Sequence, residues 1–375
     1  MRRPRCPRLR LPLLRPVRVG ALRVSAPAGT AAQFDLLGAG VEPPTGWSLL
    51  DERSRGTRFL ALPVRSALNT PATTRMGFWS INPYVGCEFG CTYCYARDTH
   101  RYTMERHGAD DADGTAPMPA WQAFEKRILV KTDIVEVLAR TLDPARLAGH
   151  SLVIGTATDC YQPAERKFRL TRQILELLLH YRGLSLGIIT KSPLVTRDLD
   201  VLQQLGERHE VTVNISLATA DPRLARRLEL RSPVPAVRLK ALRRLTDGGV
   251  HAGLLVAPIV PGITDDRAGL SQLMAKAREA GARYVVGSAL RLGPAARHRF
   301  LPILVREFPH LAERYGRHYA RREGVSPAYQ QALSRRLREL QHLHGFPLDE
   351  GMRRKQQLEG YEPRALPVVE QPSLF

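Results

Sequence analysis

From about residue 75 onward the sequence alternates short β-rich runs with amphipathic stretches of helical period. Apolar residues recur at helical spacing between the runs, as Ile134, Val137 and Leu138 do in 133–142. Strands that alternate with helices of this length pair in parallel through right-handed crossovers. The sequence therefore predicts an α/β fold with six βα units, either as an open doubly wound sheet or as a curved, incomplete barrel. The six runs are 77–82, 151–156, 184–190, 211–217, 251–259 and 283–290.

Length and composition fit one large domain with appendages. With 375 residues, 43% of them apolar, the chain is long enough to bury a substantial core. No apolar run reaches the roughly 18 residues that a membrane span needs. Five cysteines, three of them clustered, are typical of a reducing compartment rather than of a secreted disulfide framework, so we expect a cytoplasmic protein. A formal net charge of +20 favours a polyanionic partner.

Charge and composition divide the chain into four segments. We expect residues 1–67 to form a basic, partly disordered N-terminal extension, whose first 34 residues carry eight arginines and no acid. A disordered segment and a targeting peptide both fit this composition, and we favour the disordered segment. Residues 68–293 hold the βα units, residues 294–362 form a basic helical extension, and residues 363–375 form a flexible tail.

Three cysteines lie within eight residues in CEFGCTYC (87–94), directly after the first predicted strand. The loop therefore lies at the carboxyl ends of the strands, where ligands of parallel α/β folds collect. A structural zinc site needs four ligands, and Cys160 or His100 would have to complete it. A redox couple of Cys91 and Cys94 leaves Cys87 unused. Three thiolates suit a cubane iron–sulfur cluster in which one iron lacks a protein ligand.

The CxxxCxxC pattern of Cys87, Cys91 and Cys94, with Tyr93 before the last cysteine, resembles the signature of the radical S-adenosylmethionine (SAM) enzymes. The resemblance implies a partial (β/α)6 barrel with a C-terminal helical extension, and a [4Fe-4S] cluster that these cysteines hold. It also implies that SAM chelates the fourth iron. An electron from an external donor then cleaves SAM to methionine and a 5′-deoxyadenosyl radical, which abstracts hydrogen from a substrate.

Further segments over roughly 68–375 resemble the branch related to spore photoproduct lyase, whose members are often described as DNA repair photolyase-like. The resemblance implies that Lys191 pairs with the SAM carboxylate and that Ser216 contacts the cofactor. It also matches Thr158 and Asp159 to a polar pair after the second strand. The alternative interpretation of these residues is structural, with Lys191 as a loop cap, Asp159 as an acid at a helix N-terminus and Ser216 as a hydrogen-bonded strand hydroxyl. The segments include INPYVGCEFGCTYCYARDTHRY, ILVKTD, TDCYQPAERKFRLTRQIL, ITKS and ISLATADPRLARRLELRSP.

Two positions depart from the pattern of this branch. Leu230 stands between Glu229 and Arg231, where proline is common; an Arg–carboxylate pair in this segment would hold a loop over the site or lie on the surface. Spore photoproduct lyase has a hydrogen-donating cysteine at the position that Thr156 occupies here. Cys160 is then either a shifted hydrogen donor or a buried apolar filler, and we favour the filler. Reversal of a thymine dimer is therefore not predicted.

The segment QPSLF, from Gln371 to Phe375, resembles the pentapeptide by which bacterial repair and replication proteins bind the sliding clamp. Such peptides bind in extended form through a few apolar anchors. Together with the basic charge, this resemblance favours action on nucleic acid, with DNA ahead of other substrates. Two alternatives stay open: radical chemistry on RNA, a protein side chain or a small metabolite, and a non-catalytic adaptor at the clamp whose metal site is only a staple.

Overall fold

The computed structural model describes residues 49–53, 56–74, 76–100, 118–348 and 364–365, which fall within one compact unit, Pro44–Ala365. Most of the N-terminal extension and the clamp-like segment from Gln371 to Phe375 lie outside the described residues. None of the helices in these ranges is both long enough and apolar enough to cross a membrane.

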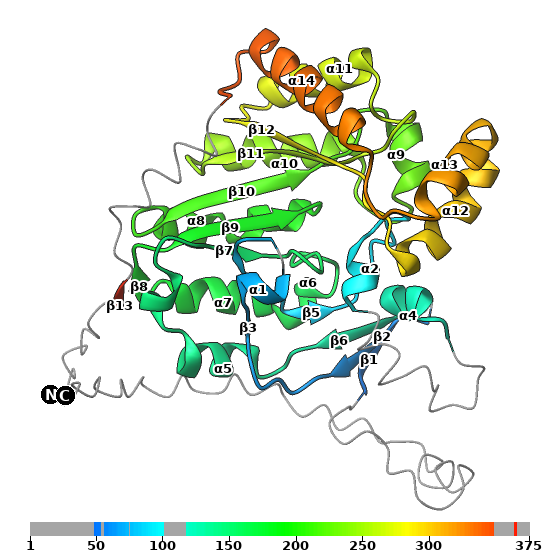
Figure 1. Ribbon diagram of the computed structural model, residues 1–375. Coiled ribbons are helices and arrows are strands. Elements are labelled where there is room, and N and C mark those ends of the chain that lie inside the picture. The colour runs from blue at the N-terminus through cyan, green and yellow to red at the C-terminus, as the bar shows by residue number, and fades with distance from the viewer. Residues whose placement is uncertain (1–48, 54–55, 75, 101–117, 349–363, 366–375) are drawn as a thin grey trace, which may run out of the picture. The chain divides into compact units, whose positions relative to one another are not determined.

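A seven-stranded sheet forms the centre of the fold (Figure 1). Six strands are parallel and come from the six predicted βα units, while the short strand β3 pairs antiparallel with β4 at one edge. The order β12-β11-β10-β9-β7-β4-β3 places successive units side by side, which confirms the predicted α/β fold with a partial barrel. The strands are β3 (Leu68–Asn69), β4 (Trp79–Ile81), β7 (Ser151–Ile154), β9 (Ser185–Thr190), β10 (Glu210–Ser216), β11 (Ala252–Ile259) and β12 (Val285–Ala289).

Helices follow the parallel strands and bury the apolar faces that the sequence predicts. Leu270, Leu273 and Met274 on α11 are buried, and the helix begins where the Asp266 carboxylate accepts a hydrogen bond from the Gly269 N–H (2.7 Å). The helices are α2 (Ala96–Thr99), α6 (Glu165–Phe168), α7 (Leu170–Leu178), α8 (Leu199–Gly206), α9 (Pro222–Leu228), α10 (Pro235–Asp247) and α11 (Arg267–Glu279).

A second, four-stranded sheet has the order β1-β2-β6-β5. Two of its strands lie within residues 1–67, so the described part of that segment is paired to the body of the fold through the parallel β2–β6 ladder. A small antiparallel pair joins β8 to β13. The remaining elements here are β1 (Leu49–Glu52), β2 (Arg58–Ala61), α1 (Pro71–Thr74), β5 (Tyr84–Val85), α4 (Ala120–Lys126), β6 (Arg127–Val130), α5 (Ile134–Thr141), β8 (Tyr181–Arg182) and β13 (Arg364–Ala365).

Among the described residues, the α-helices that follow the last strand of the seven-stranded sheet are α12 (Pro294–Glu307), α13 (Ala312–Tyr319) and α14 (Pro327–Leu343). Phe300 and Leu304 of α12 share one buried apolar cluster with Phe89 and Tyr93 of the cysteine loop. In Figure 1 the arrows of β9 and β10 point toward the side where α2, α9 and α12 lie. Helices α12 and α13 therefore pack on the cysteine loop at the carboxyl ends of the strands, whereas Leu333, Leu337 and Leu340 of α14 belong to the main core.

Candidate active site

The cysteine loop begins with a glycine turn that brings it against α4. Gly86 has φ +88°, and a Cβ there would lie 2.8 Å from the carbonyl oxygen of Phe124. Cys87 donates its backbone N–H to that same oxygen (2.9 Å). The next N–H, of Glu88, donates to Gln162 Oε1 (2.9 Å). Two neighbouring segments thus fix the position of the first cysteine.

The loop turns again at Gly90, under the side chain of Arg231. Gly90 has φ +63°, and a Cβ there would lie 2.5 Å from Arg231 Nη2. Arg231 is itself tied to the loop, because its Nε donates to the Glu88 carbonyl (2.6 Å) and its N–H to the Phe89 carbonyl (3.1 Å). The left-handed backbone conformation therefore favours glycine here, in contact with the end of the Arg231 side chain.

The segment between the second and third cysteines lies against the end of α9. Cys91 forms an isolated antiparallel bridge with Glu229, and Thr92 donates from its N–H (3.0 Å) and its Oγ1 (2.9 Å) to the Leu228 carbonyl. The Cys91 Sγ lies 3.4 Å from Ser232 Oγ. The loop is therefore held on both sides, by α4 and by the residues that follow α9.

The three cysteines share one apolar cluster, in which Cys87 and Cys91 are buried and Cys94 packs against them. Burial raises the pKa of Cys87, Cys91 and Cys94, and the pKa of Cys91 rises to about 12 although Lys191 acts to lower it. Thiolates at these positions would need a positive charge beside them, and the iron of a bound cluster would supply it. No three or more His, Cys, Asp and Glu side chains of the described residues are arranged to hold a metal ion. A cubane has a different requirement, since each thiolate binds a different iron.

Lys191 brings a positive charge to the cysteine loop from the end of β9. Its Nζ donates to Glu229 Oε1 (2.9 Å) and Ser216 Oγ (2.9 Å), and lies 3.3 Å from the Tyr93 hydroxyl. Arg238 pairs with the other Glu229 oxygen. Burial raises the pKa of Glu229, but Arg238 and Lys191 outweigh it and lower that pKa to about 2. The sequence-predicted residues Lys191 and Ser216 are thus brought together beside Tyr93.

Asp159 and Thr158 make bonds to the protein rather than pointing free into the site. The Asp159 carboxylate accepts hydrogen bonds from Thr190 Oγ1 (2.6 Å), the Lys191 N–H (2.7 Å) and the Tyr161 N–H (3.0 Å). Thr158 Oγ1 donates to the Gly86 carbonyl (2.6 Å). Asp159 therefore joins the ends of β7 and β9. Thr158, which also follows β7, is bonded to Gly86 at the start of the cysteine loop.

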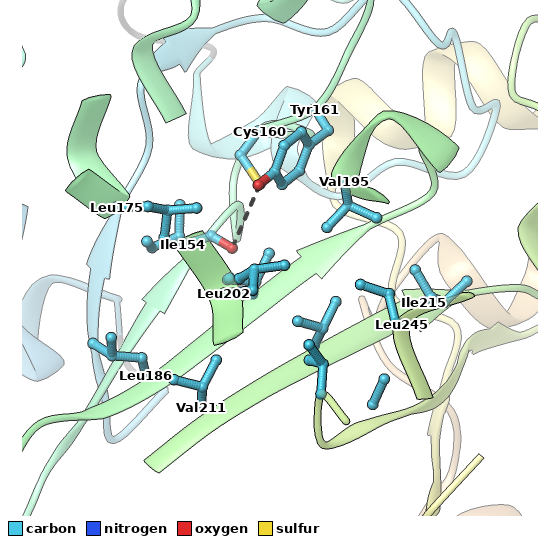
Figure 2. Close-up of a cluster of buried hydrophobic side chains, with 14 of the residues drawn as sticks. Ile154, Cys160, Tyr161, Leu175, Leu186, Val195, Leu202, Val211, Ile215 and Leu245 are labelled. Carbon is cyan, nitrogen blue, oxygen red and sulfur yellow. Dashed lines mark hydrogen bonds between the residues drawn. The ribbon is translucent and has the colours of Figure 1, made fainter. Parts of the chain in front are cut away.

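Cys160 lies apart from the other three cysteines, in the main hydrophobic core. Its side chain is fully buried, and its Sγ lies 3.6 Å from the Ile189 carbonyl and 4.0 Å from the Ile154 carbonyl. Figure 2 shows it beside Tyr161 among the buried side chains. Burial is the first cause that raises its thiol pKa. A fully buried position in the main core is what the interpretation of Cys160 as an apolar filler predicts.

One carboxylate near the site was not singled out in the sequence. Glu125 on α4 accepts hydrogen bonds from Arg97 (2.7 Å), Arg231 (2.6 Å) and Arg299 (2.9 Å). Arg97 also donates to the Cys91 carbonyl (2.9 Å). Arg231 and Glu229 therefore have different partners and do not pair within their own segment. Since these contacts join α4, α2, the segment after α9 and α12, no local spacing in the sequence signals them.

A comparison with known families gives the class of the chain. Residues 81–273 match the model of the radical SAM superfamily. This stretch holds the cysteine loop, the last residue of β4 and the whole of the parallel strands β7, β9, β10 and β11. The chain belongs to the radical SAM superfamily. Enzymes of this family use a [4Fe-4S] cluster and SAM.

Relatives of this radical SAM protein include a mycobacterial protein and a viral one. It is 33% identical to uncharacterized protein Rv2578c of Mycobacterium tuberculosis over 284 residues, which is 75% of this chain and 79% of the relative. It is 30% identical to uncharacterized protein ORF301 of Acidianus two-tailed virus, over 56% of this chain and 67% of the relative.

The fold of this radical SAM protein is shared by spore photoproduct lyase. A structure of that lyase complexed with dinucleoside spore photoproduct aligns with a TM-score of 0.54 and 16% identity, over 76% of this chain and 79% of the other. A double mutant with bound AdoMet and the same dinucleoside aligns with a TM-score of 0.51 over 71% and 74%.

Proposed function

We propose that this radical SAM enzyme acts on nucleic acid, with DNA favoured, in a repair-like reaction that begins with hydrogen abstraction. The observation that carries the proposal is that the Lys191 ammonium bonds to Tyr93, within the loop that carries the three cysteines, at the carboxyl ends of the strands. Two further observations support the substrate class: the fold shared with spore photoproduct lyase, and the net charge of +20.

Each site residue has a role in this proposal. Cys87, Cys91 and Cys94 hold the cluster. When bound, the cluster and SAM would supply a 5′-deoxyadenosyl radical that takes hydrogen from the substrate, with the electron for SAM cleavage coming from the external donor. Lys191 offers its ammonium to the SAM carboxylate, because a charge-assisted hydrogen bond is stronger than a neutral one. Ser216 holds that ammonium in place.

Thr158 and Asp159 act as positioning residues in this proposal, since each is bonded to backbone that carries another site residue. Cys160 is assigned to packing. A hydrogen donor to a substrate radical has to reach the substrate, whereas its sulfur is fully buried between two strand carbonyls. The hydrogen that returns to the substrate radical then comes from 5′-deoxyadenosine or from a group other than Cys160.

Anaerobic reconstitution with iron and sulfide, followed by reduction, tests the proposal. We expect the reduced protein to form 5′-deoxyadenosine from SAM, and a Cys94→Ala control to form none. Adding ultraviolet-irradiated DNA, intact DNA or RNA then tests the substrate, and irradiated DNA should stimulate formation most. A protein with an intact cluster that forms no more 5′-deoxyadenosine than the control refutes the catalytic proposal and favours an adaptor.

The partners are also part of the proposal. The enzyme takes its electron from an external donor and works in the reducing cytoplasm, where a low-potential cluster survives. The segment from Gln371 to Phe375, which lies outside the described residues, binds the sliding clamp. Deleting residues 371–375 should abolish binding to purified clamp without changing 5′-deoxyadenosine formation, and retention of binding contradicts the clamp proposal.

A further inference from the structure

A basic cavity opens between α9 and the end of α12. It has a volume of about 570 Å³ and is lined by arginines of both helices, with one acid and the apolar side chain of Leu230. Arg223 and Arg226 are exposed. The cavity is lined by more positive than negative side chains, so its charge suits an anion. The charged residues of the lining are Arg223, Arg226, Arg227, Arg306 and Glu307.

Three of the arginines are held by contacts within the protein. Arg226 Nη1 donates to the Leu230 carbonyl (2.7 Å). Arg227 lies over the Phe308 ring, 4.0 Å from its centroid, and its Nε pairs with Glu307 Oε2 (2.8 Å). Arg306 pairs with the other oxygen of Glu307 (2.8 Å). Guanidinium groups that are already positioned lose less conformational entropy when they bind a ligand.

The cavity adjoins the cysteine loop. Helix α9, which provides three of the arginines, ends at Leu228, whose carbonyl accepts both hydrogen bonds from Thr92. The following residue, Glu229, bonds to Lys191. A long anionic ligand held in the cavity is therefore separated from the cysteine loop by a single short helix.

We propose that this cavity binds a backbone phosphate of the nucleic-acid substrate and so anchors the strand beside the active site. The inference rests on the proposed nucleic-acid function. Guanidinium groups match phosphate oxygens with paired, charge-assisted hydrogen bonds, and contacts of this kind supply much of the affinity for nucleic acid. Glu307 competes with the phosphate, because its carboxylate occupies Arg227 and Arg306.

Because the cavity is lined by both arginines and Glu307, substitutions there should change nucleic-acid affinity in opposite directions. Full-length, reconstituted protein is titrated into a labelled oligonucleotide of about 20 nucleotides over a range of salt concentrations. Arg223→Glu and Arg226→Glu should each weaken binding by about tenfold, and should reduce the slope of log affinity against log salt by about one for each phosphate that the variant no longer binds. Glu307→Gln should strengthen binding severalfold, since it removes the competing carboxylate.

Arg140→Glu is the matched control. Arg140 is an exposed arginine on α5, and reversing it changes the net charge by the same amount at a different part of the fold. Its affinity should stay within about twofold of wild type. An equal loss in Arg140→Glu overturns the inference, because the effect is then one of net charge alone. No gain in Glu307→Gln also overturns it, because the carboxylate then does not compete with a phosphate for Arg227 and Arg306.

Two further outcomes separate this inference from the proposed function. If wild type binds the oligonucleotide and both Arg223→Glu and Arg226→Glu bind it equally well, the role proposed for the cavity is wrong and the nucleic-acid function still stands. No oligonucleotide binding by wild type overturns both. Inorganic phosphate is titrated as a competitor at constant ionic strength. Displacement of the oligonucleotide only in the presence of the intact cavity supports phosphate recognition, and equal displacement from Arg226→Glu contradicts it.

Discussion

Glu229 is the residue on which the cations of the site converge. Its side chain is 2% exposed, and Lys191, Arg238 and the Tyr93 hydroxyl all bond to it. A buried carboxylate is stable only when it is paired and hydrogen-bonded, and the two cations meet that condition. Glu229 therefore holds the Lys191 side chain in place, next to the loop that carries the cysteines.

Replacing Lys191 by methionine removes the ammonium while keeping a side chain of similar length. We expect the affinity for SAM to fall by about tenfold to hundredfold, since a hydrogen bond to a charged group contributes about 1.5–3 kcal/mol. Equilibrium dialysis of SAM against reconstituted protein measures the loss, and iron content per chain shows whether the cluster has assembled.

Lys240→Met provides the control for this experiment, because Lys240 is an exposed lysine on α10. It should bind SAM as wild type does. If Lys191→Met keeps its iron and binds SAM with unchanged affinity, the role proposed for Lys191 is wrong.

The site could be predicted in part from sequence at this scale. The cysteines and Lys191 follow predicted strands, and residues at the ends of parallel strands meet at one edge. The partners of Glu125 could not be predicted, because Arg97, Arg231 and Arg299 come from three distant segments. Their pairing depends on how helices pack, and no local pattern carries that information.

At the scale of elements, α2 and α12 are joined end to side. The Asp98 carboxylate on α2 accepts hydrogen bonds from the N–H groups of Ala295 (2.7 Å) and Ala296 (3.2 Å), in the first turn of α12. Gly293, the residue before α12, has no side chain to do this, and a Cβ there would lie 2.5 Å from Asp98 Cγ. A residue next to the cysteine loop thus supplies the cap of the C-terminal extension.

Asp98→Ala should lower the free energy of unfolding by about 1 kcal/mol, the usual effect of losing a helix cap. It should also increase hydrogen exchange in the first turn of α12 and lower the iron retained per chain. Chemical denaturation, exchange measured by mass spectrometry and iron analysis provide the three readings.

Asp266→Ala is the matched comparison, since Asp266 caps α11 through the Gly269 N–H (2.7 Å). It should cost a similar free energy of unfolding but leave α12 exchange and iron content unchanged. Equal effects of both variants on iron content would show that the α2–α12 contact has no special link to the cysteine loop.

At the scale of the whole molecule, the sequence predicted the six parallel strands of the seven-stranded sheet. Six apolar runs became six parallel strands because right-handed βα crossovers leave few arrangements. The four-stranded sheet was not predicted. Strand β2 pairs with β6 across more than 60 residues of chain, and β1 joins the sheet only through β2. Short strands of mixed composition give only a weak local signal.

Global stability should depend on pH through His209. Its Nδ1 accepts a hydrogen bond from the Leu184 N–H (3.1 Å), and its Nε2 lies 3.0 Å from the Leu178 carbonyl, so the ring fits the site only when neutral. Burial lowers its pKa to about 4. The unfolded chain then binds more protons below its ordinary pKa, and stability falls as the pH falls through this window.

Between pH 7.5 and pH 5 this histidine should cost about 2 kcal/mol of unfolding free energy. His209→Asn, whose amide oxygen can accept the Leu184 N–H, should lose that share of the pH dependence. His150→Asn, a change of an exposed histidine, should keep it. Denaturation curves at the two pH values measure the difference, and parallel pH dependence in His209→Asn and wild type would contradict this account.

Helix α2 has consequences for the spacing of the chain itself. Two consecutive side chains of this short helix contact different parts of the fold. Arg97 binds the Cys91 carbonyl and Glu125, while Asp98 binds the start of α12. One residue inserted after Cys94 would rotate the helix by about 100° and carry both side chains away from these groups. The register from Cys94 to Asp98 is therefore as strict as the spacing of the cysteines, and it extends the motif by one helical turn.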